Sequence, residues 1–563
     1  MSFDLVIKNG TVVDGSGGAS YRADVGVTDG KITAIGRINE KSTETVDAEG
    51  HVVSPGFVDG HTHMDAQVFW DPIGSCSCYH GVTSVIMGNC GFTLAPCAKE
   101  NADYVFKNLE RAEDISREAM LAGIDWAWET FPEFLDVLEG LPKGINYGGY
   151  IGHSALRTYV MGEKAFEAEA SEDELKAMQQ IVKEAVLAGA MGFSTSRTFN
   201  HATADDRPVA SRLATWDEVR AIVNTVGETG KGLFELAGEA PGRDPDAVRE
   251  YHVRLRDLAV ESGVTQTWGL FSNGSLPEYW HTFADLLDET AAAGGRMFAQ
   301  VHSRGLNTLL SFESNLPFDH WEHWKDFRAL PLSEQKAKLL NPDIRTKLVE
   351  VASQPYNGPR IIGAELRPPK WDYVYPMDDM QYDKPSMAQL AAEKDVHPVE
   401  LMIDMALDRD LKMFFRSPIA NEDMNEVIKL IKHPRSVVTF SDSGAHVSQI
   451  MDSSLQSHLL SYWVREKEAL SLEEAVRQIT YNPATMWRLH DRGLIREGMA
   501  ADMVVFDPET IGPNMPEVVH DLPSGATRLK QTARGIKNTI VNGDVLLTNN
   551  EHSGAAPGRL LRS

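Results

Sequence analysis

Short runs of alternating hydrophobic and polar residues, separated by turn signals, fill the first 55 positions of the chain. The run DLVIKNGTVVDG carries Asn9-Gly10 between two β-rich stretches, and ADVGVTDGKITAIG repeats the arrangement around Asp29-Gly30. An Asn-Gly or Asp-Gly pair in such a setting is a strong signal for a β-hairpin. The pattern therefore predicts an all-β segment over residues 1–55.

The same pattern returns near the C-terminus, in residues 491–563. GMAADMVVFDP and NTIVNGDVLL are typical of strands, and Asn542-Gly543 provides a turn. Because a β-sheet must bury one of its faces, β segments at both ends favour a small β-sandwich domain in which the two ends meet around a central domain. Two unrelated β caps are the alternative.

Between these ends, apolar strand-like runs alternate with helical patterns. The runs lie at residues 57–63, 84–90, 147–153, 191–195, 232–236, 264–268, 298–302 and 437–442. SEDELKAMQQIVKEAVLAG is typical of a connecting helix, with Ser171 as its cap, Glu174 at capping-box spacing and a glycine at its end. The alternation predicts an α/β fold, a (β/α)8 TIM barrel over residues 56–490. PRIIGAEL and LKMFFRS are also strand-like, which leaves the assignment of the last three strands open.

A long insertion precedes the last predicted barrel strand, at about residues 303–435, and it exceeds the length of one crossover connection. Its aromatic residues include Trp321, Trp324, Phe327, Trp371, Tyr373 and Tyr375. Aromatic side chains in a barrel-loop insertion favour a lid or a wall of a substrate pocket. The alternative is that these rings form the core of a small helical subdomain.

Composition and charge narrow the classes of function. The 563 residues are 42% hydrophobic and 24% charged, as in ordinary globular proteins, and the formal net charge is -27. So acidic a surface repels the phosphates of nucleic acids and of anionic membranes, and we expect neither as a partner. No apolar run reaches the roughly 18–20 residues of a membrane span, and no signal peptide is visible. Since four cysteines at this length form no disulfide framework, we expect a cytoplasmic protein.

The stretch GFVDGHTHMD, residues 56–65, joins an apolar run to His61 and His63. Residues two apart on a strand point to the same face, so the two imidazoles face one way at a strand end. Paired histidines in this arrangement are typical of a metal site. Two polar residues on a solvated edge are the alternative for an isolated H-x-H motif, and the other strand ends decide between the two interpretations.

Reactive side chains also fall at the ends of other predicted strands, where barrel enzymes carry their active sites. They are Cys90, His153, Glu235, His302 and Asp442. Such a rim favours metal-assisted hydrolysis, in which a divalent ion activates water and polarises a carbonyl group. Asp442 is the candidate general base and acid, which takes the proton from water and passes it to the leaving amine. A turn or N-cap aspartate in SDSG is the alternative.

Several motifs resemble the amidohydrolase superfamily, and within it the D-aminoacylase or N-acyl-D-amino-acid deacylase branch. They are PGFVDGHTHMD, GVTSVIMGNCG, GAMGFSTS, TYNPATMWRLHDRGLIREGMAADMVVFDP and NGDVLLTNNEHSGAAPGRLLR. The resemblance covers nearly the whole chain. It implies a (β/α)8 barrel with a β-sandwich built from both termini. It also implies zinc-dependent hydrolysis of the C–N bond in a small-molecule amide such as an N-acyl amino acid.

The metal ligands of that family can be transferred only in part. Its first-strand histidines correspond to His61 and His63, its metal-bridging cysteine to Cys90, and its last-strand aspartate, both ligand and proton carrier, to Asp442. Its further zinc histidines close the fifth and sixth strands, which here read GLFELAGEA and VTQTWGLF. We therefore expect one zinc ion, with Cys90 as a thiolate ligand or as a small buried hydrophobe. Glu235 is a possible replacement ligand, or else a buried glutamate paired with an arginine.

Three further residues are candidates for substrate binding. Trp268, at the end of the sixth strand, would wall the pocket with an apolar face. His153 and His302 either hydrogen-bond the substrate or are satisfied core histidines. Other functions stay open: hydrolysis of a cyclic amide or of a bulkier apolar amide or ester on a mononuclear site, or a non-catalytic binding protein with a degenerate metal site. A homo-oligomer is a possible assembly.

Overall fold

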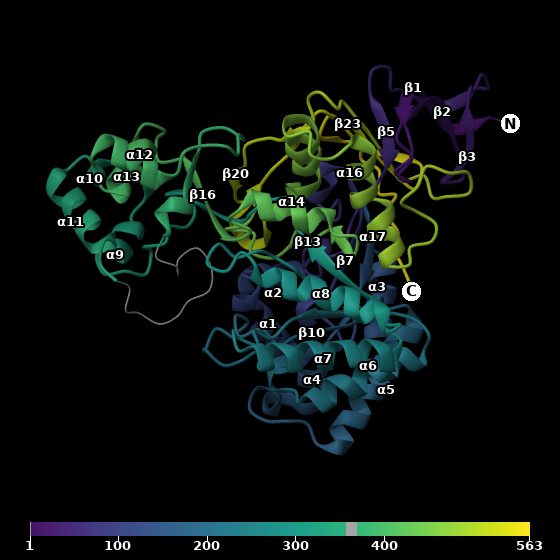
Figure 1. Cartoon of the computed structure of the whole chain (residues 1–563), viewed down its shortest axis with the longest axis horizontal. Coiled ribbons are helices and arrows are strands. Elements are labelled where there is room, and N and C mark those ends of the chain that lie inside the picture. The colour runs from purple at the N-terminus through teal and green to yellow at the C-terminus, as the bar shows by residue number, and fades with distance from the viewer. Residues whose placement is uncertain (1, 356–368) are drawn as a thin grey trace.

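The computed structural model describes residues 2–355 and 369–563. Within these residues, eight parallel strands form a barrel surrounded by helices (Figure 1). In order around the barrel they are β6 (Phe57–Asp59), β7 (Val82–Met87), β8 (Asn146–Gly149) continued by β9 (Ile151–Gly152), β10 (Gly192–Ser196), β11 (Leu233–Ala237), β12 (Thr265–Gly269), β13 (Met297–Val301) and β17 (Ser436–Val438). Each strand overlaps one of the predicted runs, and the (β/α)8 fold is confirmed.

The barrel closes through the segments that follow its first and last strands. Thr62 and Ser443 form a parallel β-bridge. The N–H group of Asp442 donates to the carbonyl oxygen of His61 at 3.1 Å, and the N–H group of His63 donates to that of Ser443 at 2.7 Å. Closure therefore places the ends of β6 and β17 side by side, although they are far apart in the sequence.

The helices around the barrel include α3 (Phe131–Gly140), α4 (His153–Met161), α5 (Glu172–Ala188), α6 (Trp216–Glu228), α7 (Pro245–Ser262), α8 (Tyr279–Ala292), α14 (Met424–Lys432) and α16 (Leu472–Ile479). The predicted helix α5 is confirmed with its capping box, since Ser171 and Glu174 each accept a hydrogen bond from the other's N–H group. Gly189 ends it in the left-handed conformation, at φ 118. Among the described residues, none of the helices is both long and apolar enough to cross a bilayer.

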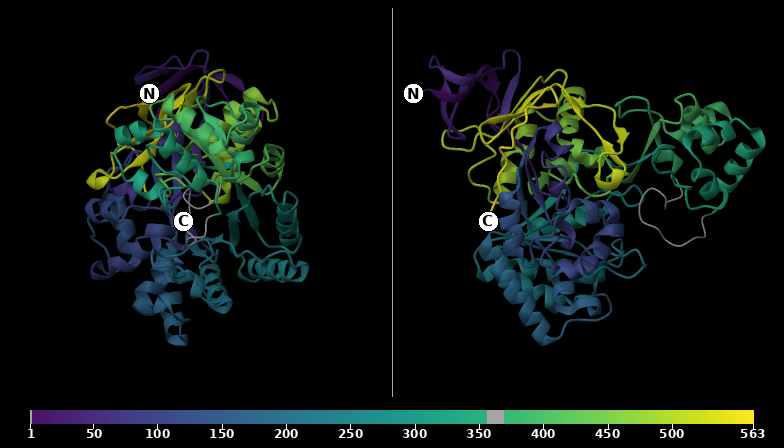
Figure 2. Two further views of the ribbon diagram at one scale, coloured as in Figure 1. Left: turned by 90° about the vertical axis from the view of Figure 1, so that its left-hand side faces the viewer. Right: turned by 180° about the vertical axis from the view of Figure 1, so that it is seen from behind.

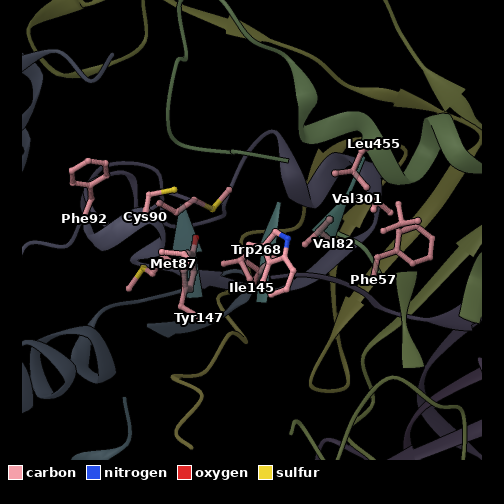
Figure 3. Close-up of a cluster of buried hydrophobic side chains, with 14 of the residues drawn as sticks. Phe57, Val82, Met87, Cys90, Phe92, Ile145, Tyr147, Trp268, Val301 and Leu455 are labelled. Carbon is pink, nitrogen blue, oxygen red and sulfur yellow. The ribbon is translucent and has the colours of Figure 1, made fainter. Parts of the chain in front are cut away.

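A large hydrophobic core lies inside the barrel and between the barrel and its helices. Figure 3 shows part of it, in which Phe57, Val82 and Val301 from three barrel strands lie in one cluster with Leu455. Cys90, just beyond the end of β7, belongs to the same cluster. The apolar core therefore reaches the carboxyl ends of the strands.

Strands from both ends of the chain lie side by side (Figure 2) and build one nine-stranded sheet. Its order is β25-β24-β23-β18-β5-β1-β2-β3, with β4 beside β1. The strands are β1 (Phe3–Val12), β2 (Tyr21–Thr28), β3 (Lys31–Gly36), β4 (Ser42–Asp47), β5 (Val52–Pro55), β18 (Met503–Phe506), β23 (Ile536–Val541), β24 (Asp544–Thr548) and β25 (Glu551–His552). The two ends join where β5 runs antiparallel to β18, with Val53 opposite Val505. The prediction that both termini build one β domain is confirmed.

Two of the three predicted hairpin turns are present. Asp29-Gly30 connects β2 to β3, and Asn542-Gly543 connects β23 to β24. The prediction at Asn9-Gly10 is wrong, because β1 continues through this pair and its register shifts there, as in a β-bulge. Asn9 is left-handed, at φ 63, and it binds aspartate side chains of β2 and β4 at 2.9 Å each. Asn tolerates the left-handed conformation that a hairpin turn requires, and at Asn9 the same conformation forms a β-bulge.

The insertion before β17 forms a lobe at one side of the molecule (Figures 1 and 2). It contains β14 (Leu306–Leu310), α9 (Trp324–Arg328), α10 (Leu332–Leu339), α11 (Pro342–Ala352), β15 (Tyr375–Met377), α12 (Met387–Lys394), α13 (Pro398–Leu407) and β16 (Phe414–Ala420). Trp321, Trp324 and Phe327 are buried in a hydrophobic cluster of this lobe, as a helical subdomain requires. LKMFFRS overlaps β16, which pairs with β14 and β15 and not with the barrel. PRIIGAEL lies outside the described residues.

Candidate metal centre

Both histidines of the H-x-H motif are buried just beyond the end of β6. Their rings lie 5.5 Å apart between centroids, edge to face. Backbone hydrogen bonds to the segment after β17 fix both residues, so Asp442 comes within reach of the two imidazoles. The geometry that the sequence motif suggests is therefore assembled by closure of the barrel.

His61 presents its Nε2 atom to the centre. Its Nδ1 atom lies 2.6 Å from Gln300 Oε1, an acceptor, so Nδ1 carries the proton. The ring is stacked on Phe440 at 3.8 Å. The Nε2 lone pair then faces Cys90 Sγ at 3.6 Å and Asp442 Oδ1 at 3.5 Å. Burial lowers the pKa of His61 to about 3, which keeps the ring neutral.

His63 lies between two carboxylates. Its Nε2 atom is 3.1 Å from Asp442 Oδ1 and 3.5 Å from Glu113 Oε2. Neither ring nitrogen has a hydrogen bond of good geometry. Burial lowers the pKa of His63, but the Glu113 and Asp442 charges outweigh it and raise the pKa to about 9. At neutral pH the His63 ring is therefore protonated, and its positive charge is attracted by both carboxylates.

Asp442 follows β17 and is left-handed, at φ 57, a conformation that Asp tolerates. Burial opposes its ionisation, but the neighbouring imidazoles hold its pKa well below the usual range. Its side chain is 14% exposed, whereas His61 and His63 are at most 2% exposed. Asp442 is therefore an ionised and partly exposed group at the end of the barrel.

Cys90 sits in a tight turn after β7 and is also left-handed, at φ 56. Its N–H group donates to Glu235 Oε2 at 2.7 Å. Burial and the nearby carboxylates raise the pKa of the Cys90 thiol well above its usual range. A bound cation would reverse this preference, because metal coordination stabilises the thiolate.

Glu235, on β11, is completely buried, and burial raises its pKa to about 8. One carboxylate oxygen accepts the Cys90 N–H bond, while the other has no hydrogen-bond partner and lies 3.8 Å from His61 Nδ1. In the described parts of the chain no arginine forms an ion pair with Glu235. Its clearest contact is thus to the backbone of Cys90.

Among the described residues, three overlapping groups place ligand atoms within 4.8 Å of one another. The groups are His61, His63 and Cys90; Cys90, Glu113 and His201; and His63, Glu113 and Asp442. Imidazole, thiolate and carboxylate are the donors that zinc prefers. Several buried atoms here, among them His63 Nε2 and Glu113 Oε1, lack hydrogen-bond partners. Because unpartnered buried polar atoms are costly, the donor set fits a divalent cation.

Two members of these groups, Glu113 and His201, have no local sequence signal that predicts them. Glu113 directly follows helix α1 (Ala102–Ala112), within RAEDIS, where no strand end or motif marks it. His201 lies in the loop after β10, five residues beyond the strand. Neither residue lies at the end of a strand, so the rule that barrel enzymes carry their reactive groups at strand ends does not point to them.

The three candidate substrate-binding residues lie outside these ligand groups. His153 begins α4, and its Nδ1 and Nε2 atoms each have a hydrogen-bond partner at 2.8 Å, Thr195 and Glu218. Trp268 is buried in the barrel cluster of Figure 3, and its indole N–H has no partner. His302 directly follows β13.

His302 is buried, and its Nε2 atom has no hydrogen-bond partner, although Asp452 Oδ1 lies 3.7 Å away. Two residues on, the Arg304 guanidinium is also buried. Its Nη2 atom donates to Asp452 Oδ1 at 3.0 Å and to the Met451 carbonyl oxygen at 2.8 Å, but Nε and Nη1 have no acceptor. This end of β13 therefore holds unused hydrogen-bond donors.

Comparison with known proteins identifies the family. Residues 44–259 and 373–547 match the sequence profile described as Amidohydrolase family. The chain belongs to this family. The match includes the barrel strands β6 to β11 and β17 and most of the C-terminal strands, but not β12 and β13. It confirms the resemblance found in the sequence.

Members of the family with named activities are similar over nearly the full length. N-acyl-D-glutamate deacylase of Alcaligenes xylosoxydans xylosoxydans is 28% identical over 574 residues, covering 99% of this chain and 96% of that protein. D-aminoacylase of the same organism is 25% identical over 568 residues, covering 99% and 97%. An uncharacterized protein of Mycobacterium tuberculosis is 28% identical over 548 residues, covering 90% and 85%.

Solved structures of such amidohydrolases share the fold. N-acyl-D-glutamate deacylase from Bordetella bronchiseptica, complexed with zinc and a phosphonate inhibitor, has a TM-score of 0.66 at 22% identity. A D-aminoacylase structure has a TM-score of 0.68 at 21% identity. Both comparisons cover 100% of each chain. The barrel and the two-ended β domain are thus common to these amidohydrolases and this chain.

Proposed function

We propose that this protein is a metal-dependent amidohydrolase that cleaves the amide bond of an N-acyl amino acid. The observation that carries the proposal is the approach of His61 Nε2 and His63 Nε2 to one oxygen, Asp442 Oδ1, at 3.5 and 3.1 Å. The activities named for similar proteins, N-acyl-D-glutamate deacylase and D-aminoacylase, support the substrate class. The zinc in the similar deacylase structure supports zinc as the ion.

His61, His63 and Asp442 would hold the ion, with Cys90 beside them. The chemistry that such an ion supplies is to lower the pKa of water toward about 7 and to polarise a carbonyl group. The neutral His61 ring suits this role, because Gln300 fixes its tautomer and directs Nε2 to the centre. Glu235 would hold the Cys90 turn in place through the N–H bond at 2.7 Å.

Asp442 would move the proton. Its low pKa keeps it a carboxylate at neutral pH, and it is the most exposed side chain among the expected ligands. A carboxylate in this position accepts a proton from the attacking water and donates it to the nitrogen of the leaving amine. The bond formed is C–O, the bond broken is the amide C–N, and the proton ends on the amine.

The end of β13 would receive the rest of the substrate. An N-acyl amino acid carries a carboxylate, and the free Nε and Nη1 donors of Arg304 suit such a group. His302 Nε2, also without a partner, lies at the same strand end. Trp268 would contribute an apolar wall. His153, with both nitrogens bonded inside the protein, would support the packing of α4 on α6.

Metal content and substrate panels test the proposal together. We expect tightly bound zinc in the purified protein, and less of it in the His61→Ala variant. A panel of N-acyl D- and L-amino acids, cyclic amides and aryl amides should give turnover mainly with the N-acyl amino acids. Turnover only of cyclic or aryl amides would reject the substrate class, and a metal-free, inactive protein would instead support a binding function.

A further inference from the structure

We infer that the centre has a second cation position, held by Cys90 Sγ, a Glu113 carboxylate oxygen and His201 Nε2. This inference rests on the proposed function, because it assumes that the cluster binds a divalent cation. The three residues come from the turn after β7, the end of α1 and the loop after β10. The position is therefore built from loops and not from the ends of the fifth and sixth strands.

The distances suit one ion. The three ligand atoms lie within 4.8 Å of one another, and His201 Nε2 lies 3.9 Å from Glu113 Oε1. One thiolate, one imidazole and one carboxylate form a donor set that favours zinc over magnesium or calcium. Three protein ligands leave a tetrahedral ion one open position.

A hydrogen bond at Nδ1 orients the His201 ring so that Nε2 is available as a metal ligand. Its Nδ1 atom lies 2.8 Å from Ser196 Oγ at the end of β10, and its ring lies 5.2 Å from that of Phe92. A hydrogen bond at one ring nitrogen is the usual support of a metal-ligating histidine, because it fixes the ring and directs the other nitrogen to the ion. His201 Nε2 then faces Glu113.

Glu113 has a buried carboxylate oxygen without a hydrogen-bond partner, as expected of a metal ligand. Its side chain is 2% exposed, and its Oε1 atom has no hydrogen-bond partner. The backbone is held on both sides, because the Glu113 N–H group donates to Leu109 at 3.0 Å and its carbonyl oxygen accepts from His446 at 2.6 Å. Oε2 lies 3.5 Å from His63, so one carboxylate faces both cation positions. Such a group is suited to bridge two ions.

Among the described residues, no side chain of the fifth or sixth strand belongs to the ligand groups. Glu235 of β11 accepts the Cys90 N–H bond with one oxygen but lies outside these groups, and Trp268 of β12 has no ligand atom. Cys90 belongs both to the group with His61 and His63 and to the group with Glu113 and His201. Its Sγ atom lies 3.6 Å from His61 Nε2. Glu113 and His201 place their ligand atoms within 4.8 Å of Cys90 Sγ, and they complete a set that the strand ends leave incomplete.

The test is zinc stoichiometry of the full chain, measured by elemental analysis after equilibration with free zinc. We expect two equivalents in the wild-type protein. His201→Asn should weaken the second equivalent by more than about 100-fold and keep the first, because a direct ligand matters more than the outer groups that tune it. Glu113→Gln, which preserves shape, should have the same direction. His61→Ala should instead lose the first equivalent.

His252→Asn is the matched control. His252 is a buried histidine of α7 whose Nε2 atom also lacks a partner, but it lies outside the ligand groups, so this variant should keep two equivalents. Thermal melting without metal shows whether each variant folds. One equivalent in the wild-type protein, lost in His61→Ala, would overturn the second position and leave the proposed function intact. Two equivalents retained in both His201→Asn and Glu113→Gln would also overturn it. No bound zinc at all would reject the proposed function itself.

Discussion

The two histidines of the H-x-H motif acquire opposite proton affinities from their surroundings. His61 faces Gln300 and the Phe440 ring, so burial dominates and its pKa falls. His63 faces Glu113 and Asp442, so charge dominates and its pKa rises. A cation placed among these groups would displace the proton of His63, and metal binding should therefore release protons.

Replacing Asp442 by Asn tests the proposed role of this residue in proton transfer. Asn tolerates the left-handed backbone of this position, so the fold should be preserved. Turnover of an N-acyl amino acid at saturating zinc should fall by about 10²–10⁴-fold, the usual contribution of a general acid or base. Steady-state kinetics with parallel zinc analysis measure this effect, and a rate near that of the wild type would contradict the role.

Replacing Arg304 by Lys tests recognition of the substrate carboxylate. Lysine keeps the positive charge beside Asp452 but loses the planar fork of donors. KM for an N-acyl amino acid should rise about 10-fold or more, which corresponds to the loss of roughly one charge-assisted hydrogen bond. The matched substrate is the same acylated amine without its carboxylate, for which KM should change little. An equal change for both substrates would argue against this contact.

Of the single residues at the candidate metal centre, the sequence predicts only a part. His61, His63, Cys90 and Asp442 are visible because each follows a strand-like run, and the structure brings them together. Glu113 follows a helix, and its place at the centre depends on how α1 returns to the barrel. No local pattern records that path, which is why a single sequence could not reveal it.

The elements show where local signals suffice. Turn signals succeeded at Asp29-Gly30 and failed at Asn9-Gly10, since a left-handed Asn satisfies a bulge as well as a turn. LKMFFRS is apolar enough for a barrel strand, but the lobe also has a core that needs such a strand. Hydrophobic pattern predicts that a strand exists, and only the long-range packing decides which sheet it joins.

Gly192 in GAMGFSTS tests the contact between β10 and β11. A Cβ atom at this position would lie 1.9 Å from the carbonyl oxygen of Leu233, and its φ of +136 disfavours other residues. Gly192→Ala should therefore lower the melting temperature strongly or abolish soluble protein. Gly140→Ala, at the end of α3 where the added Cβ would meet no atom within 4 Å beyond its chain neighbours and the backbone of its own helix, should melt close to the wild type. Similar melting of both variants would contradict the close approach.

Glu218 gives the packing of α6 on α4 a dependence on pH. Burial opposes its ionisation, but hydrogen bonds from His153 and the Arg157 guanidinium outweigh burial and lower its pKa to about 2. A carboxyl group whose pKa is lower in the folded state adds stability above its unfolded pKa, about 4.5. That stability is lost as the pH falls from about 4.5 to about 2.

Glu218→Gln should therefore melt at a lower temperature than the wild type at pH 7. The difference in melting temperature between the two proteins should become smaller as the pH falls from about 4.5 toward about 2. The measurement is thermal melting of both proteins between pH 7 and pH 3. A difference that stays constant over the whole range would show that the ionised carboxylate is not what stabilises this contact.

Across the whole molecule, Asp502 joins the β domain to the barrel. It is buried and paired with Arg492, it accepts the N–H group of Asn542 at 2.7 Å, and it accepts the side-chain amide of Asn146 at 3.0 Å. Asn146 lies on barrel strand β8, whereas Asn542 lies at the turn between β23 and β24. One carboxylate thus links residues from three distant parts of the sequence.

Asp502→Ala should destabilise the protein by about 3–5 kcal/mol, because it removes the only buried carboxylate that the structure pairs with the Arg492 charge among the described residues. Asp491→Ala is the matched control. Asp491 contacts the same guanidinium at 3.1 Å, but its side chain is 64% exposed, so its loss should cost no more than about 1 kcal/mol. Chemical denaturation of both variants measures the difference, and equal losses would contradict the linking role of Asp502.

The pairing of β5 with β18 has a consequence for biosynthesis. The ribosome synthesises β5 (Val52–Pro55) long before β18 (Met503–Phe506). The edge of β5 that pairs with β18 therefore stays unpaired while about 450 further residues are synthesised. Polypeptides truncated before β18 keep that edge open, and an open edge is a template for aggregation. Complete synthesis is therefore the step that protects the newborn chain from association with its own copies.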